Sequence, residues 1–244
     1  MVDFHSHILP RVDDGSASVE ESIEMLRLEG EQGVTCVVAT PHFFPRHDTP
    51  EAFLARRAAA EARLRREMAG HPGLPELVCG GEVTFFRGMS DSEFLPKLTL
   101  EGGNHILVEM PPAPWPEEFY RELEAIWQKH RITPIIAHID RCIGLFRTHG
   151  IPRRLAEMPV LVQANGDFFL DKGRSFLAMK LLKADQIQLL GSDCHNLTTR
   201  KPNLGPALAR IREKAGDTAL KRIDRYERQI LGAESHPNKN GVVV

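Results

Sequence analysis

Short apolar runs alternate with longer segments of helical periodicity along almost the whole chain, and this alternation constrains the fold more than any other feature. Seven runs have the composition and length of strands: 2–5, 34–40, 77–83, 106–110, 133–138, 160–165 and 187–193. Helical periodicity covers 19–32, 51–68, 117–130, 172–183 and 206–231. Strands that alternate with helices in this way are typical of repeated βα units around a parallel sheet.

Length and composition are those of one enzyme-sized domain. The chain has 244 residues, of which 42% are hydrophobic, enough for the core of a single barrel domain. Its formal net charge is -2, and basic residues are interspersed with acidic ones, which argues against a nucleic-acid partner. Residues 233–244 lack periodicity, so we expect one domain over 1–232 followed by a disordered tail.

Cysteine usage and hydropathy indicate a cytoplasmic protein. The four cysteines, Cys36, Cys79, Cys142 and Cys194, have no paired spacing, which favours a reducing compartment. The N-terminus lacks the pattern of a signal peptide, and no apolar run approaches the roughly 20 residues that span a bilayer. We therefore expect no insertion into a membrane.

Polar residues with metal-ligand chemistry stand where the apolar runs stop. Six of the seven runs end at or lead into such residues, namely His5, His7, His42, Glu82, Glu109, His138, Asp193 and His195. The carboxyl ends of parallel barrel strands open on one face, where active sites are built. We therefore expect these side chains to converge.

Each of these residues has an ordinary structural explanation, and it is their coincidence that predicts a metal site. A lone histidine is more often a surface or core residue, but Glu109 ends a buried run and needs a partner there. Mixed imidazole and carboxylate ligands suit Mn, Fe or Zn better than Ca or Mg. There are too many ligands for one ion, so we expect a cluster of two or three divalent metals.

Several short motifs resemble those of the PHP (polymerase and histidinol phosphatase) superfamily. They occur in order along the chain: 3–10 (DFHSHILP), 13–15 (DDG), 39–42 (ATPH), 81–82 (GE), 109–110 (EM), 137–138 (AH) and 192–196 (SDCHN). The chain looks closest to the bacterial protein-tyrosine phosphatases associated with capsule and exopolysaccharide synthesis. The resemblance implies an α/β fold, a distorted (β/α)7 TIM-like barrel, and a trinuclear site that is usually manganese-dependent.

The resemblance also implies a role for each matching residue. One metal would be held by His5, His7, Glu82 and Asp193; a second by Glu82, Glu109 and His138; a third by Asp14, His42 and His195. Arg141 and Arg200 fall where the family places its phosphate-binding arginines. The segment 139–142 reads IDRC where relatives usually have Pro-Glu-Arg, so this loop departs from the pattern although the arginine remains.

These roles predict hydrolysis of phosphotyrosine through a metal-activated hydroxide. Arg141 and Arg200 would bind the phosphoryl oxygens. Tyrosine leaves as a phenolate with a pKa of about 10, so the demand for a general acid is modest, and Asp14 or a metal-bound water would supply the proton. The resemblance points to the tyrosine-rich C-terminal tail of a bacterial tyrosine kinase as the protein partner.

Three other functions compete with this prediction. A small-molecule phosphatase, such as a histidinol phosphatase, would keep the site and change the substrate. A metal-dependent amidohydrolase also begins with a His-x-His strand, but commonly bridges its metals with a lysine of the fourth strand, where this chain has Glu109. A catalytically silent metal-binding or kinase-docking module would not need the two arginines.

A last rival concerns the mechanism, because Cys194 and Arg200 have the Cys-x5-Arg spacing of cysteine-dependent tyrosine phosphatases. That chemistry needs a thiolate of lowered pKa inside a tight loop of backbone N–H groups. Here Asp193 precedes the cysteine, and no glycine lies between Cys194 and Arg200. We therefore expect Cys194 not to be the nucleophile.

Overall fold

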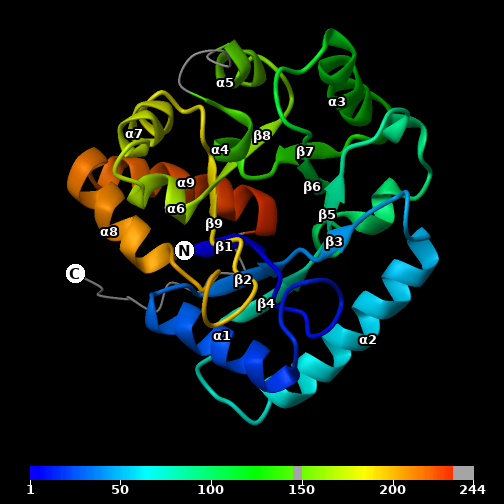
Figure 1. Cartoon of the computed structure of the whole chain (residues 1–244), viewed down its shortest axis with the longest axis vertical. Helices are drawn as coiled ribbons and strands as arrows, with labels where there is room; N and C mark the ends of the chain where they lie inside the picture. Colours follow the sequence, from blue (N-terminus) through cyan, green and yellow to red (C-terminus); the bar gives the residue numbers. More distant parts are fainter. Residues whose placement is uncertain (145–149, 233–244) are drawn as a thin grey trace.

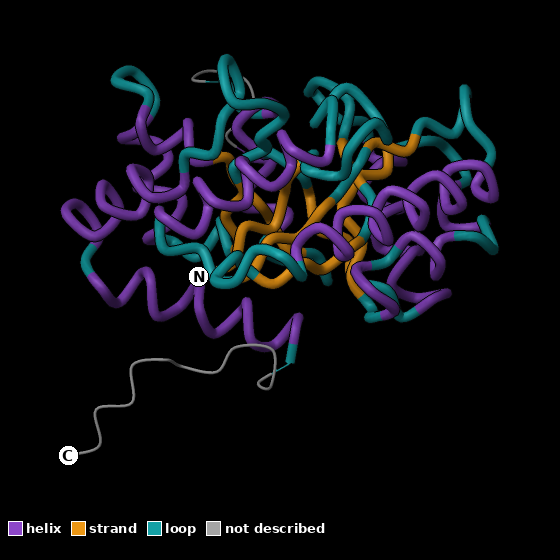
Figure 2. The backbone as a smooth tube through the Cα atoms, turned by 90° about the horizontal axis from the view of Figure 1, so that it is seen from below, coloured by secondary structure: helices purple, strands orange, loops and turns teal. Residues whose placement is uncertain are grey.

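Parallel strands form a curled sheet with helices around it in the computed structural model, which describes residues 1–144 and 150–232 (Figures 1 and 2). Every pairing between named strands is parallel. The strands are β1 (Val2–Ser6), β2 (Cys36–Ala39), β3 (His42–Phe43), β4 (Glu76–Cys79), β5 (Glu82–Thr84), β6 (His105–Glu109), β7 (Thr133–Ile136), β8 (Leu161–Asn165) and β9 (Leu189–Gly191).

The strands differ from the predicted runs at two places. The second run, 34–40, contains β2 alone, and β3 follows it after Pro41 as an additional short strand that was not predicted. The third run, 77–83, is divided into β4 and β5, with Gly80 and Gly81 between them. Proline has no N–H to donate to a ladder, and a side chain at position 80 would lie 2.5 Å from Leu100, so neither segment continues as one regular strand.

The sheet curls until its last strand meets its first. Strand order is β1-β2-β4 in one sheet and β3-β5-β6-β7-β8-β9 in the other, joined where β2 leads into β3 and β4 into β5. Beyond β9, Ser6 forms a parallel bridge with Cys194, and the N–H of Asp193 donates to the carbonyl of His5 at 2.7 Å. The predicted α/β barrel of distorted form is therefore confirmed, and the carboxyl ends of its strands gather at one face.

The helices follow the predicted segments with some changes. They are α1 (Val19–Glu31), α2 (Pro50–Met68), α3 (Glu117–His130), α4 (Ile139–Cys142), α5 (Gly150–Leu155), α6 (Gly166–Leu170), α7 (Ser175–Lys183), α8 (Leu204–Ala215) and α9 (Asp217–Leu231), with short 3-10 helices at Met89–Asp91, Leu95–Leu98 and Leu100–Gly102. The single helix expected over 206–231 is two, because Gly216 has a φ of 77° and ends α8.

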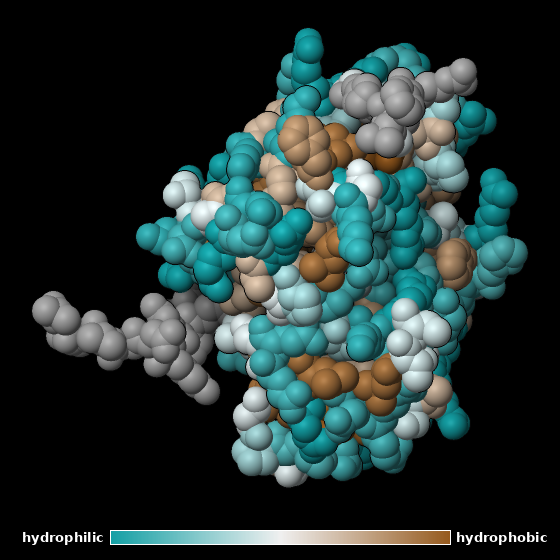
Figure 3. All heavy atoms as spheres, turned by 60° about the vertical axis from the view of Figure 1, so that its left-hand side comes forward, coloured by the Kyte–Doolittle hydropathy of each residue, from teal (hydrophilic) through white to brown (hydrophobic). Residues whose placement is uncertain are grey.

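Two apolar clusters stabilise the arrangement. The larger one joins the sheet to the surrounding helices, and a smaller one includes Val2, Phe4 and Leu107 and packs against Tyr226 and Ile230 of α9. The face with α7 and α8, turned forward in Figure 3, is mostly hydrophilic with small separate apolar patches.

The four cysteines are all buried and free of disulfides, as their spacing predicts. In the described part of the chain, no helix has both the length and the apolar composition needed to cross a bilayer. The tail predicted for 233–244 lies outside the described residues.

Candidate active site

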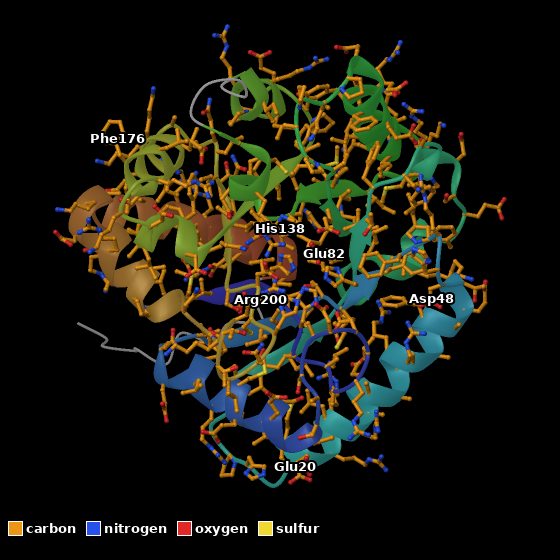
Figure 4. All side chains as sticks on the ribbon, in the orientation of Figure 1. Glu20, Asp48, Glu82, His138, Phe176 and Arg200 are labelled. Atoms are coloured by element: carbon orange, nitrogen blue, oxygen red, sulfur yellow. The ribbon has the colours of Figure 1, made fainter. Side chains whose placement is uncertain are left out.

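The predicted metal ligands meet at the carboxyl ends of the strands. Figure 4 shows Glu82, His138 and Arg200 close together near the centre of the barrel. The potential ligand atoms form four groups, and within each group all the ligand atoms lie within 4.8 Å of one another: His7, Asp14, His42 and His195; His5, Glu82 and His138; His5, His7 and Asp193; and His42, Glu82 and Glu109. All nine residues that sequence reasoning singled out as ligands are therefore brought together.

Glu82 lies in the middle of these groups and is fully buried. Its Oε2 is 3.2 Å from His5 Nε2, 3.4 Å from His7 Nε2 and 2.9 Å from His42 Nδ1. Its Oε1 accepts from His138 Nε2 at 2.8 Å. Burial alone would raise the pKa of this carboxyl, but the surrounding imidazoles outweigh burial and hold its pKa well below the ordinary value.

The two histidines of β1 have ring nitrogens that face each other. Nε2 of His5 is 3.1 Å from Nε2 of His7. The opposite nitrogen of each ring faces an acceptor: His5 Nδ1 is 3.3 Å from Gln163 Oε1, and His7 Nδ1 is 2.6 Å from Asp13 Oδ2. In the neutral tautomers that these acceptors favour, the proton is on Nδ1, so two lone pairs point at each other.

That arrangement needs a positive charge between the rings, and a divalent cation fits it. Two other buried ligand atoms lack a hydrogen-bond partner among the described residues, namely His138 Nδ1 and His195 Nε2. Buried polar atoms are normally satisfied, so a set left without hydrogen bonds marks a place for an ion. Imidazole and carboxylate donors together suit Mn, Fe or Zn.

Asp13 orients His7 and was not assigned a role from the sequence. Its Oδ2 also accepts from the backbone N–H of His42 at 2.8 Å. Burial opposes ionisation of this carboxyl, but its contacts with His7 lower its pKa to about 2. The loop fits closely, because a side chain at Gly15 would lie 2.1 Å from the carbonyl oxygen of His7. The acidic pair at 13–14 was the signal for this residue.

Two amides of β8 position ligands on neighbouring strands. Gln163 Oε1 accepts from the backbone N–H of His138 at 2.7 Å, and Asn165 Nδ2 donates to Asp193 Oδ2 at 3.0 Å. Neither amide was assigned a role from the sequence. A polar pair two residues apart in the apolar run 160–165 was the available signal, because such side chains share one face of a strand.

Both predicted phosphate-binding arginines contact the same carboxylate. Nη2 of Arg200 donates to Asp193 Oδ1 at 2.7 Å, and Nη2 of Arg141 donates to Asp193 Oδ2. Both guanidinium groups remain partly exposed, with 36% and 45% of the side-chain surface accessible. Each guanidinium has further N–H groups beyond the one that contacts Asp193, and such groups can donate to an anion.

The backbone at two candidate ligands lies in the left-handed region. His138 has a φ of 29° and Asp193 a φ of 54°. Non-glycine residues adopt such angles at a cost, and the surrounding contacts must compensate for it. The two residues are held by Gln163, which binds the backbone of His138, and by the hydrogen bond from Asp193 N–H to the carbonyl of His5.

Cys194 points away from these groups and has none of the properties of a nucleophile. Its side chain is completely buried, and its Sγ lies 3.9 Å from Glu29 Oε1. Burial, followed by the charges of Glu29 and Asp3, raises the pKa of the thiol well above its ordinary value. The Cys-x5-Arg spacing is therefore a coincidence of sequence, and the thiolate mechanism is excluded on physical grounds.

Solved structures resemble this barrel along its whole length. One, from work on YwqE of Bacillus subtilis and CpsB of Streptococcus pneumoniae described as metal-dependent tyrosine phosphatases, matches with a TM-score of 0.81 and 25% identity, covering 95% of this chain and 94% of that one. A lactonase from Listeria monocytogenes matches with a TM-score of 0.52 and 13% identity, covering 92% and 91% of the two chains, which shows the fold alone.

Sequence comparisons agree with the structural ones. The tyrosine-protein phosphatase CpsB of Streptococcus pneumoniae is 30% identical over 236 residues, covering 91% of this chain and 94% of the relative. The tyrosine-protein phosphatase YwqE of Bacillus subtilis is 28% identical over 226 residues, covering 88% and 85%. The family model for capsular polysaccharide synthesis, CpsB/CapC, matches residues 1–230. The chain therefore belongs to the CpsB/CapC family of capsular polysaccharide synthesis proteins.

Proposed function

We propose that this chain hydrolyses phosphotyrosine in proteins at the site built around Glu82. Membership of the family makes it a metal-dependent tyrosine-protein phosphatase of the CpsB/YwqE type. The observation that supports this particular site is the pair of imidazole Nε2 atoms, of His5 and His7, 3.1 Å apart next to a buried carboxylate. Two partly exposed arginines stand beside them and complete a place for an anion.

The four groups of ligands support a cluster of two or three divalent ions, with Mn²⁺ as the first candidate and Fe or Zn as alternatives. Glu82 belongs to two of the groups, so it would bridge ions, with His5 and His138 on one side and His42 and Glu109 on the other. Asp193 would complete the ligands of His5 and His7. Asp14 and His195 would complete the outer group, nearest to solvent.

A bound cluster would supply charge neutralisation for the phosphoryl oxygens and a water acidified for attack. The protein itself would orient the substrate. Asp193 accepts a hydrogen bond from one nitrogen of each guanidinium, which fixes the positions of Arg141 and Arg200. Their remaining N–H groups would bind the phosphoryl oxygens in a geometry that favours in-line attack.

Asp14, or a water on a bound ion, would supply the proton of the leaving group. The Asp14 side chain is 66% exposed, and its Oδ1 lies 3.5 Å from His195 Nε2 and 3.7 Å from His42 Nε2. A tyrosine phenolate has a pKa of about 10 and needs little assistance, so one carboxyl at the entrance of the site is sufficient as a general acid.

The exposure of Asp14, Arg141 and Arg200 supports a substrate that reaches the site from solvent, such as a flexible peptide segment. We propose the C-terminal tail of a bacterial tyrosine kinase as that segment. Its phosphotyrosines would have to reach into the site, because most of the ligands below the entrance are buried.

The test is turnover of a phosphotyrosine peptide and of histidinol phosphate by the metal-stripped protein, reconstituted separately with Mn²⁺, Fe²⁺, Zn²⁺ and Mg²⁺. We expect no turnover without metal, the highest kcat/KM with Mn²⁺, and a clear preference for the peptide. A preference for histidinol phosphate would replace the proposed substrate. Full activity after chelation would contradict the proposed site.

A further inference from the structure

An open groove of about 410 Å³ lies beside the site, between the loop after β1 and the loop after β3. It is lined by Asp14 and His42, which belong to the outer group of candidate ligands. Phe44, His47 and Arg56 of α2 also line it. A volume of this size is within the range of small-ligand sites. The groove therefore opens directly from the reaction centre.

The wall of the groove contains one aromatic ring, that of Phe44, which is not packed in the hydrophobic core. Phe43 is fully buried, and its ring contacts the Phe53 ring with centroids 5.2 Å apart. The next residue, Phe44, is 41% exposed, and its ring stacks on His42 with centroids 4.9 Å apart and planes 29° apart. The Phe44 ring therefore packs against the imidazole of His42, a candidate metal ligand. The exposed part of the Phe44 ring is available to stack with an aromatic ring that enters the groove.

The loop that presents Phe44 is ordered by its own hydrogen bonds. The carbonyl of Phe44 accepts from the N–H groups of His47 at 2.9 Å and Asp48 at 3.0 Å. Asp48 in turn forms an ion pair with Arg56, whose Nε donates to the carbonyl of Val12 at 3.4 Å. Figure 4 shows Asp48 near the start of α2, away from the central ligands. The two walls are therefore joined before any substrate binds.

We infer that this groove receives the aromatic ring of phosphotyrosine, and that Phe44 determines the preference for aryl over alkyl phosphates. The inference rests on the proposed function. In phosphotyrosine a single ester oxygen separates the phosphorus from the ring, and on the protein side Phe44 is in contact with His42. A phosphate at the ligand cluster therefore places the ring next to Phe44, within the spacing of offset-stacked aromatic pairs.

Phosphoserine has no ring to place in the groove, so it would leave Phe44 uncovered. The contribution of the stacked pair is then a difference in affinity between two ligands that have the same charged group. A comparison of benzylphosphonate with methylphosphonate isolates this difference. Both are stable analogues of a phosphate monoester, and only the first has a ring at the distance of the phenyl group in phosphotyrosine.

The experiment measures inhibition constants of the two phosphonates on the Mn²⁺-loaded enzyme and on Phe44→Ala, Phe44→Leu and Phe44→Tyr. We expect Phe44→Ala and Phe44→Leu to raise the constant for benzylphosphonate about three- to tenfold and to leave that for methylphosphonate unchanged. Phe44→Tyr should behave as the wild type. Phe176→Ala is the matched control, because Phe176 is 83% exposed on α7, far from the site in Figure 4.

Three results would overturn the inference. Equal increases for both phosphonates would mean that Phe44 acts only by supporting His42, and metal content would fall with them. No increase, or a wild type that does not prefer benzylphosphonate, would remove the aryl site. An unchanged benzylphosphonate constant with a raised KM for the peptide would assign the groove to a neighbouring side chain of the peptide. Failure of the proposed function is separate, since it appears as absent turnover of phosphotyrosine by the wild type.

Discussion

Two buried clusters of potential ligands meet at the turn formed by Asp193, Cys194 and His195, and they differ in what balances their charge. The cluster around Glu82 contains four imidazoles in contact with one carboxylate. The other consists of Asp3, Glu29 and Cys194, whose potential ligand atoms also lie within 4.8 Å of one another. Distances alone make both of them candidate metal sites.

Hydrogen bonding and protonation separate the two. The Asp3 carboxylate accepts from the N–H of His5 at 3.0 Å and from Ser192 through its N–H at 2.9 Å and its hydroxyl at 2.5 Å. Burial, and after it the charge of Asp3, raises the pKa of Glu29 well above the ordinary value, so this second cluster keeps a proton. The pKa of Glu82 moves in the opposite direction because imidazoles surround it.

Proximity of donors is therefore an insufficient criterion for a metal site. In the Glu82 cluster two imidazole Nε2 atoms face each other at 3.1 Å, and the rim of the cluster includes the exposed side chain of Asp14. The Asp3 cluster is completely buried and satisfies most of its acceptors with protein donors. We interpret the Asp3 cluster as a brace that fixes β1 against the turn after β9.

The largest difference in activity and bound metal should appear when the same Glu→Gln substitution is made separately in each of the two clusters. Glu82→Gln should lower kcat/KM for a phosphotyrosine peptide by at least about a hundredfold and reduce bound metal, because an amide cannot bridge cations. Glu29→Gln makes the same chemical change in the other cluster and should retain metal. Metal analysis by mass spectrometry together with kinetics checks both variants. Equal metal content in the two would remove the distinction between the clusters.

The second largest effect on activity should come from the two arginines at the open side of the Glu82 cluster. Arg141→Ala and Arg200→Ala should each keep their metal and lose between about tenfold and a thousandfold in kcat/KM, since each removes charge-assisted hydrogen bonds to phosphate. Arg87→Ala is the control, because Arg87 is 78% exposed and pairs with Glu118 at the surface. Loss of metal in either site variant would show that the arginine anchors the cluster through Asp193 instead of binding substrate.

A smaller effect should appear in the pH dependence of the free energy of unfolding, and Glu29 of the Asp3 cluster should cause it. The pKa of Glu29 in the folded chain is above the ordinary 4.5, so between these two values the folded chain binds more protons than the unfolded chain. The contribution of Glu29 to the free energy of unfolding should therefore fall as the pH rises from 4.5 toward the raised pKa. Glu29→Gln should weaken this slope. Denaturant titrations at several pH values measure it, and an identical slope in both proteins would contradict the protonated brace.

The weakest effect is expected for Cys194→Ser. The thiol is buried in the Asp3 cluster and has a raised pKa, so the serine variant should keep most of its phosphatase activity and all of its sensitivity to chelation. Activity with and without chelator, followed by addition of Mn²⁺, is the measurement. An inactive serine variant combined with a chelator-resistant wild type would make Cys194 the nucleophile.

Much of the fold and most of the site could be predicted because both depend on short-range patterns. Apolar runs of strand length and the helical periodicity between them indicated the βα repeat, and the ligands stand where those runs stop. The short strand β3, the division of the third run and the break at Gly216 within the last helical region were not predicted. Each break depends on local backbone geometry that hydropathy does not record.

The order of residues along the chain was enough to predict which of them meet at the candidate site, because parallel strands present their carboxyl ends on one face whatever the details of packing. How those residues are held became visible only in the folded barrel. The His5 tautomer depends on Gln163, the orientation of Asp193 on Asn165 and the two arginines, and the groove on Phe44 stacking against His42. Hydrogen bonds and ring contacts are directional, and their partners come from strands and loops distant along the chain, so no local pattern records them.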